Sequence, residues 1–399
     1  MKRARKVIGP LIVYFGIGLL LISLPNGSRH FHPSEIIASA HVFNLLEWEI
    51  KNLPDKWVHQ LTGLFLRSSY EKETDSEILN MYFSLLAEQS VLLRDMKPKY
   101  DNDVSQNIPS DLSDRVEEII EVALTDILRS EGFGIWRNIL LPPVDIKLGI
   151  LPNVLIVSPR NKIEREYDLL LRSSVTVDDR ERIENQLAKE ANLSALVENI
   201  GGLATYPAQI PVSESLRWTL RTSAHEWIHH YLFFRPLGQN MFMSQDMVIL
   251  NETLASIAGD EIGDIALDLF DYQLHATVKT ISSPDTPVGE YFDFESEMRK
   301  LRSQVDTLLE SGNVEDAESL MDEKRLVFVA NGYNIRKINQ AYFAFYGSYG
   351  DSAASVSAIG PQLQELRTSV PDLFTFVNTV ANVSTYEEFL GIISSSDND

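Results

Sequence analysis

The spacing of apolar and polar positions divides the chain into three regions. Between Pro33 and Phe133, apolar residues recur every three to four positions, which is typical of amphipathic helices. The runs with this spacing are 34–50, 76–93 and 111–128. We therefore expect a helical N-terminal region over 25–133.

Short β-rich runs, interrupted by proline and glycine, follow the helical region. They cover 144–151, 153–159 and 202–212, and a helix with one polar face is predicted at 177–200. Strands with one intervening helix indicate a small mixed β-sheet.

Helical spacing returns at Ser213 and continues almost to the C-terminus. The predicted helices are 213–234, 246–270, a hairpin over 296–332 that turns at Gly312, 334–350 and 359–380. Residues 391–399 are expected to form a disordered tail. The predicted fold class is α+β and mostly α-helical, with the main domain at 134–390.

The N-terminus has the pattern of a membrane anchor. Four basic residues within the first six precede an uncharged run, Val7–Leu24, which as a helix would be about 27 Å long, close to the hydrocarbon thickness of a bilayer. We interpret 1–24 as a transmembrane helix with a cytoplasmic N-terminus and the rest outside the cytoplasm, either at the cell surface or in the periplasm. A cleaved signal peptide is the alternative.

Composition restricts the possible chemistry. The formal net charge of −22 repels phosphate backbones, which argues against nucleic acid as a partner. The chain contains no cysteine, so disulfides, thiolate metal sites and cysteine nucleophiles are excluded. Any metal ion must therefore be bound by His, Asp or Glu side chains.

The segment "HEWIH" matches the H-E-x-x-H pattern with His225, Glu226 and His229. Residues four apart lie on the same face of a helix, so the two imidazoles can bind one Zn²⁺. Glu226 is rotated about 100° from His225, so it flanks the metal as a candidate general base for zinc-activated water. His230, the next residue, is expected to be a supporting or surface residue for the same geometric reason.

A catalytic zinc needs a third protein ligand. No histidine follows His229 at the metzincin position, but "NETLAS" places Glu252 at the start of the next predicted helix. A glutamate on a neighbouring antiparallel helix would complete a His₂Glu site.

"HEWIH" followed by "NETLAS" resembles the gluzincin metallopeptidases, and more closely the bacterial membrane-anchored predicted aminopeptidases of the zincin class. The resemblance implies a zincin-like domain in which His225, His229 and Glu252 bind zinc and Glu226 is the base. A later stretch with Asn339, Ala341 and Tyr349 has a similar order, and it makes Tyr349 a candidate oxyanion donor.

The chain departs from the family pattern at several positions. Ser256 stands where some gluzincins have an aspartate, with Asp260 one turn later, and Gln340 replaces the second asparagine of the later stretch. Tyr346 is an alternative oxyanion donor. The glycine-containing stretch before the metal helix, through Gly202, Ala204 and Tyr206, is expected to bind extended substrate backbone as an edge strand.

These features favour a membrane-anchored zinc metallopeptidase that hydrolyses peptide or protein substrates. Two alternatives remain open at this stage. One is a zincin-like envelope interaction protein without catalytic activity, built on the helices of 25–133. The other is a zinc amidohydrolase that acts on a non-peptide envelope substrate.

Overall fold

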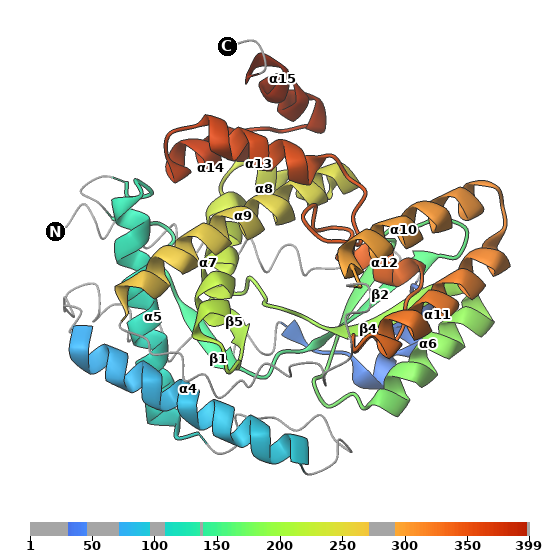
Figure 1. Ribbon diagram of the computed structural model, residues 1–399, viewed down its shortest axis with the longest axis horizontal. Helices are drawn as coiled ribbons and strands as arrows, with labels where there is room; N and C mark the ends of the chain where they lie inside the picture. Colours follow the sequence, from blue (N-terminus) through green and yellow to red (C-terminus); the bar gives the residue numbers. More distant parts are fainter. Residues whose placement is uncertain (1–30, 46–71, 96–107, 136–138, 271–291, 397–399) are drawn as a thin grey trace.

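The computed structural model describes residues 31–45, 72–95, 108–135, 139–270 and 292–396. Helices predominate around two small sheets (Figure 1), which confirms the predicted α+β class. The helices are α2 (Pro33–Ile37), α4 (Lys72–Asp95), α5 (Ser110–Ser130), α6 (Val177–Ala191), α7 (Leu216–Phe233), α8 (Pro236–Gln239), α9 (Gln245–Leu269), α10 (Phe294–Glu310), α11 (Val314–Ala330), α12 (Gln340–Tyr346), α13 (Ile359–Ser369), α14 (Leu373–Ala381) and α15 (Tyr386–Ser396). The strands are β1 (Ile146–Gly149), β2 (Asn153–Pro159), β3 (Tyr167–Leu171), β4 (Leu193–Asn199) and β5 (Ala208–Pro211).

The prediction of a single mixed sheet is wrong. The described strands form a parallel pair, β1–β5, and a separate antiparallel sheet in the order β3–β2–β4. The helix predicted over 177–200 ends at Ala191, because Asn192 takes a left-handed conformation with φ 56°. Residues 193–199 then form β4, which pairs with β2 over its full length.

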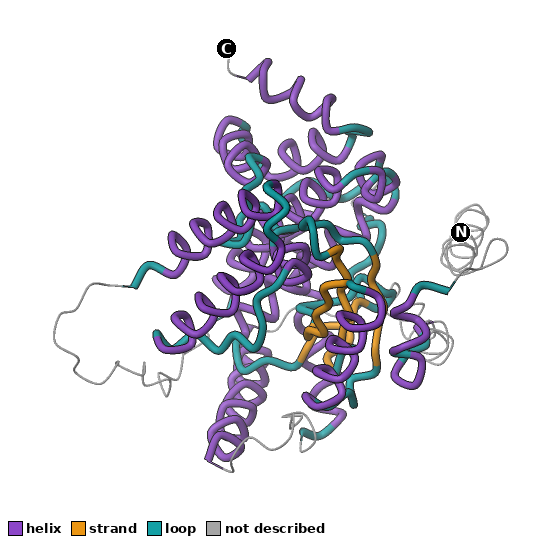
Figure 2. The backbone as a smooth tube through the Cα atoms, turned by 90° about the vertical axis from the view of Figure 1, so that its right-hand side faces the viewer, coloured by secondary structure: helices purple, strands orange, loops and turns teal. Residues whose placement is uncertain are grey.

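Three hydrophobic cores hold these elements together. The largest joins α4 and α5 to β1, β5, α7, α9 and the C-terminal helices. The second lies between one face of the β3–β2–β4 sheet and α10–α12, and the third lies between the opposite face, α6 and α2. Figure 2 shows the strands enclosed by helices. The N-terminal helices α4 and α5 therefore share a core with α7 and α9, whereas α2 packs against α6 and the sheet.

Most of the other helix predictions are confirmed, with four differences. The helix predicted over 34–50 is wrong in its described part, because α2 ends at Ile37 and Val42 pairs with Leu171 of β3. The hairpin of α10 and α11 turns at Gly312, whose φ is 77°. Of the run 334–350, only Gln340–Tyr346 is helical, and 359–380 divides into α13 and α14, whose first turn is capped by Asp372. The disordered tail over 391–399 is wrong as far as Ser396, because 391–396 belong to α15.

The predicted anchor over 1–24 lies outside the described residues. Among the helices of the described ranges, none combines the length and apolar character that crossing a bilayer requires.

A buried ion pair connects α6 with the segment before α12. The Glu184 carboxylate is 1% exposed and lies 2.5 Å from Arg336 and 2.7 Å from Lys337. Burial raises the pKa of Glu184, but the hydrogen bonds and charges of the two cations outweigh burial and hold this pKa below its usual 4.5.

Candidate metal centre

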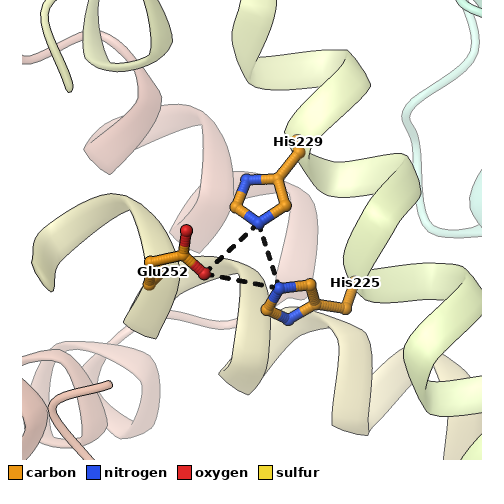
Figure 3. Close-up of side chains that lie close together, drawn as sticks. All are labelled: His225, His229 and Glu252. Carbon is orange, nitrogen blue, oxygen red and sulfur yellow. Dashed lines mark hydrogen bonds and ion pairs between the residues drawn. The ribbon is translucent and has the colours of Figure 1, made fainter. Parts of the chain in front are cut away.

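Two helices, α7 and α9, supply the three predicted metal ligands. Each helix begins with a serine N-cap, Ser215 and Ser244, whose hydroxyl accepts a hydrogen bond from a backbone N–H of the first turn. His225 and His229 lie one turn apart on α7, and both point toward Glu252 on α9 (Figure 3). The structure thus brings together all three predicted ligands.

The separations among the donor atoms fit one small cation. The Nε2 atoms of His225 and His229 are 3.0 Å apart, and the Glu252 Oε2 atom lies 3.7 and 3.5 Å from them. Ligands about 2.0–2.1 Å from a tetrahedral zinc ion are separated by about 3.4 Å. The triangle of donor atoms therefore has the dimensions of one face of a zinc tetrahedron, which leaves the fourth position open.

The electrostatics of the triad also suit a cation. Burial raises the pKa of Glu252, but the histidines outweigh burial and hold it well below 4.5. Burial lowers the pKa of His229, but the negative charge of Glu252 raises it to about 9. The Glu252 carboxylate therefore stays ionised, and either a protonated His229 or a bound cation balances its charge.

Two glycines on α9 set the approach of the helices. A Cβ atom on Gly259 would lie 2.8–2.9 Å from the backbone and Cβ of His225, and one on Gly263 would lie 2.6 Å from Arg221. Glu252, Gly259 and Gly263 are seven and four residues apart, so they lie on one stripe of α9. His225 and Arg221 follow in the opposite order along α7, as expected for antiparallel helices.

Ion pairs reinforce this register. The Arg221 guanidinium binds Asp264 with contacts of 2.7 and 2.9 Å, and it reaches Asp260 at 3.1 Å. Asp260, which lies one turn after the position of the family aspartate, thus binds an arginine. Neither these contacts nor the glycine stripe was identified from the sequence, although the G-x-x-x-G spacing was readable there.

Glu226, the predicted base, is buried beside the triad. Its side chain is turned toward Gly202, where an added Cβ atom would lie 2.0 Å from the Glu226 Oε1 atom. The residue is 5% exposed, and burial raises its pKa, an effect that the charges of His225 and His229 oppose. Gly202 was predicted to bind substrate, and the structure adds that it makes room for Glu226.

The edge strand predicted through Gly202, Ala204 and Tyr206 is wrong in extent, because β5 begins at Ala208 and 202–207 contain one isolated bridge, at Leu203. This stretch forms a short edge next to Glu226. Leu203 and Gln209 exchange backbone hydrogen bonds of 3.0 and 2.9 Å. Within the described chain, the N–H and C=O of Gly202 and the N–H of Ala204 form no hydrogen bond to another backbone group. Since alternate residues of a strand direct their backbone groups to opposite sides, these groups lie on the side away from β5.

His230 holds this edge in place. The ring is 3% exposed, and its Nε2 atom lies 2.7 Å from the Thr205 carbonyl oxygen. Burial lowers the pKa of His230 to about 4, so the ring is neutral and its Nε2–H donates to that carbonyl. Tyr206, predicted to bind substrate, packs its ring edge-on against His230 at 5.5 Å.

Of the two candidate tyrosines, Tyr349 reaches the triad. Its hydroxyl hydrogen-bonds to Glu252, whose charge, together with burial, raises the pKa of Tyr349 well above 10. The rings of Tyr349 and His225 are 6.5 Å apart. Tyr346 instead packs on Tyr342 at 4.6 Å, where burial and the charge of Glu198 raise its pKa.

A hydroxyl on α9 positions the Tyr349 segment. The N–H of Gly350 donates to Thr253 Oγ1 at 2.8 Å, and that hydroxyl donates to the Ile249 carbonyl at 2.6 Å. The link was not foreseen, because nothing in the local pattern relates residues 97 positions apart.

Together these residues define a class of site: a compact His₂Glu centre on two antiparallel helices, with the buried Glu226 carboxylate and the Tyr349 phenol beside it. No protein-family model, curated protein or solved structure matches the chain.

Proposed function

We propose that the protein is a zinc metallopeptidase of the gluzincin type. The observation that carries the proposal is the triangle of donor atoms from His225, His229 and Glu252, with edges of 3.0–3.7 Å and Glu226 buried beside it. His₂Glu is the ligand set of catalytic zinc sites that leave a position for water or substrate. When bound, zinc would polarise a carbonyl group and make water more acidic.

Each neighbouring side chain has a role in this proposal. The Glu226 carboxylate accepts a proton from water and passes it to the leaving amine. Burial raises the pKa of Glu226, which makes the carboxylate a better proton acceptor. The Tyr349 hydroxyl, which hydrogen-bonds to the ligand Glu252, is the proposed donor to the developing oxyanion.

The edge at Gly202 and Ala204 supports a peptide as substrate. An extended peptide can pair with the backbone groups of this edge, as in other complexes that add a strand. The absence of a side chain at Gly202 brings that peptide directly beside Glu226. We propose further that Val7–Leu24 anchors the protein in a membrane and that the catalytic domain acts outside the cytoplasm.

Metal analysis combined with peptide digestion tests the proposal. We expect about one zinc ion per wild-type chain and per E226Q chain, and loss of zinc in H225A and E252A. A peptide library should be cleaved by wild type and left intact by E226Q and by chelator-treated protein. Zinc bound without cleavage would indicate the non-catalytic alternative, and unchanged zinc content in E252A would refute the assigned ligand set.

A further inference from the structure

Arg165 leaves part of its hydrogen-bonding capacity unused within the described chain. It lies in the loop between β2 and β3, and its side chain is 29% exposed. Its Nε donates to Asp168 at 2.5 Å, and within the described chain no hydrogen-bond partner meets the two terminal nitrogens. Asp168 thus fixes the orientation of a guanidinium group whose outer donors are free.

The other charged residues of this loop bind one another or other elements. Arg160 forms a bidentate pair with Glu318 and also reaches Asn192. Lys162 pairs with Glu164. Arg165 differs because Asp168 binds only its Nε, and no carboxylate of the described chain meets its two terminal nitrogens.

Aromatic contacts place this guanidinium on the Tyr349 side of the metal centre. The Arg165 Cζ atom lies 5.6 Å from the centre of the Phe345 ring, and that ring lies 6.5 Å from the Tyr349 ring. The two separations limit the distance from Arg165 to the Tyr349 ring to about 12 Å, the length of three to four extended residues.

We propose that Arg165 binds a carboxylate of the substrate, within about five to six extended residues of the scissile bond, because the Tyr349 ring is a further 6.5 Å from the His225 ring. This inference rests on the proposed peptidase function and adds a substrate class: peptides with a C-terminal carboxylate or an acidic side chain on this side. A planar guanidinium with two free nitrogens matches a carboxylate bidentately. In a chain of net charge −22, a local cation is needed to attract an anionic group.

Matched peptides test the inference on the wild-type protein. A peptide that the protein cleaves is compared with its C-terminal amide and with forms in which each Glu or Asp is replaced by Gln or Asn. We expect one of these changes to raise KM roughly tenfold to a hundredfold with little change in kcat, the effect of losing a charge-assisted bond in both ground and transition states. The change that raises KM identifies which carboxylate Arg165 binds.

Variants connect that preference to Arg165. In R165Q the KM values of the charged and neutral peptides should become equal, and R165K should retain part of the difference. R182Q, which removes an arginine from an exposed position of α6, is the matched control and should retain the full difference. A wild-type protein that does not distinguish the peptides, or an R165Q variant that still does, overturns the inference; the first comparison needs no variant to fold.

Failure of the proposed function gives a different result. If the wild-type protein cleaves no peptide, the proposed function fails, and the acid and neutral peptides are then compared by calorimetric binding to the zinc-loaded protein. Preferential binding of the acid, lost in R165Q, supports the role of Arg165. Equal binding of both peptides overturns it.

Discussion

Replacing Gly202 with alanine would place a methyl group where the Glu226 carboxylate now lies. The added Cβ atom would be 2.0 Å from Oε1, 2.7 Å from Cδ and 3.0 Å from Cγ of Glu226. Nonbonded carbon atoms pack at about 3.5–4.0 Å, so the carboxylate has to move by roughly 1 Å. The three metal ligands are not among the nearest atoms to this position.

The size of the effect follows from that displacement. Moving a catalytic group by about 1 Å costs about a hundredfold in rate, or about 2.7 kcal/mol in the activation barrier. We therefore expect G202A to lower kcat about a hundredfold and to leave zinc affinity within about a factor of two of wild type. G201A provides the matched control, because a Cβ atom at Gly201 would meet nothing within 4 Å.

Two measurements on the same samples decide the outcome. Zinc affinity is measured by competition with a chelator, and kcat is measured with a peptide selected from the library digestion. Equal kcat values for G202A and G201A would refute the position that we assign to Glu226. A parallel loss of zinc affinity in G202A would show that the edge supports the metal ligands and not the base.

Three further predictions concern the supporting structure. G259A should weaken zinc binding tenfold or more in chelator competition, because its methyl group separates α7 from α9, whereas G391A, which meets nothing within 4 Å, should not. T253V removes the acceptor of the Gly350 N–H and should lower both kcat and the melting temperature, with a cost in unfolding free energy of about 1–3 kcal/mol. Folding holds the pKa of Glu184 below 4.5, so the ionised carboxylate stabilises the fold above pH 4.5, and this stabilisation is lost as the pH falls through the folded pKa. The E184Q variant should lack this pH-dependent part of the unfolding free energy in acid denaturation, and identical acid profiles of the variant and wild type would contradict the prediction.

The parts of the site that depend on local spacing were predictable. His225, Glu226 and His229 belong to one helix, so their relative directions follow from 3.6 residues per turn. Glu252 required one additional assumption, that the next helix returns antiparallel, and α9 does so, since Gly259 meets His225 and Gly263 meets Arg221. Tyr349 was proposed from a loose resemblance, and the structure places it nearer the triad than Tyr346.

The sheets were not predictable in the same way, because strand pairing is a nonlocal property. β4 exists because residues 193–199 pair with β2, about 40 residues earlier in the chain. Residues 193–199 continue the apolar spacing of α6, so the pattern alone predicts one long helix. The left-handed conformation of Asn192, which ends α6, is not visible in that pattern. The parallel pairing of β1 with β5 is also nonlocal, because nothing in the local spacing of either strand relates it to the other.

The register of α7 against α9 is a nonlocal property, like strand pairing, but it depends on a glycine spacing that can be read in the sequence. Gly259 and Gly263 have no side chain with which to fill a core, so a pair of glycines inside a long helix costs about 1 kcal/mol each relative to alanine. Such a cost is offset where another backbone must come close, and here that backbone carries His225. Because Glu252 lies on the same stripe, the glycines that admit α7 also direct the carboxylate toward the two imidazoles. The stripe of Glu252, Gly259 and Gly263 is therefore as much a part of the metal motif as the histidines are.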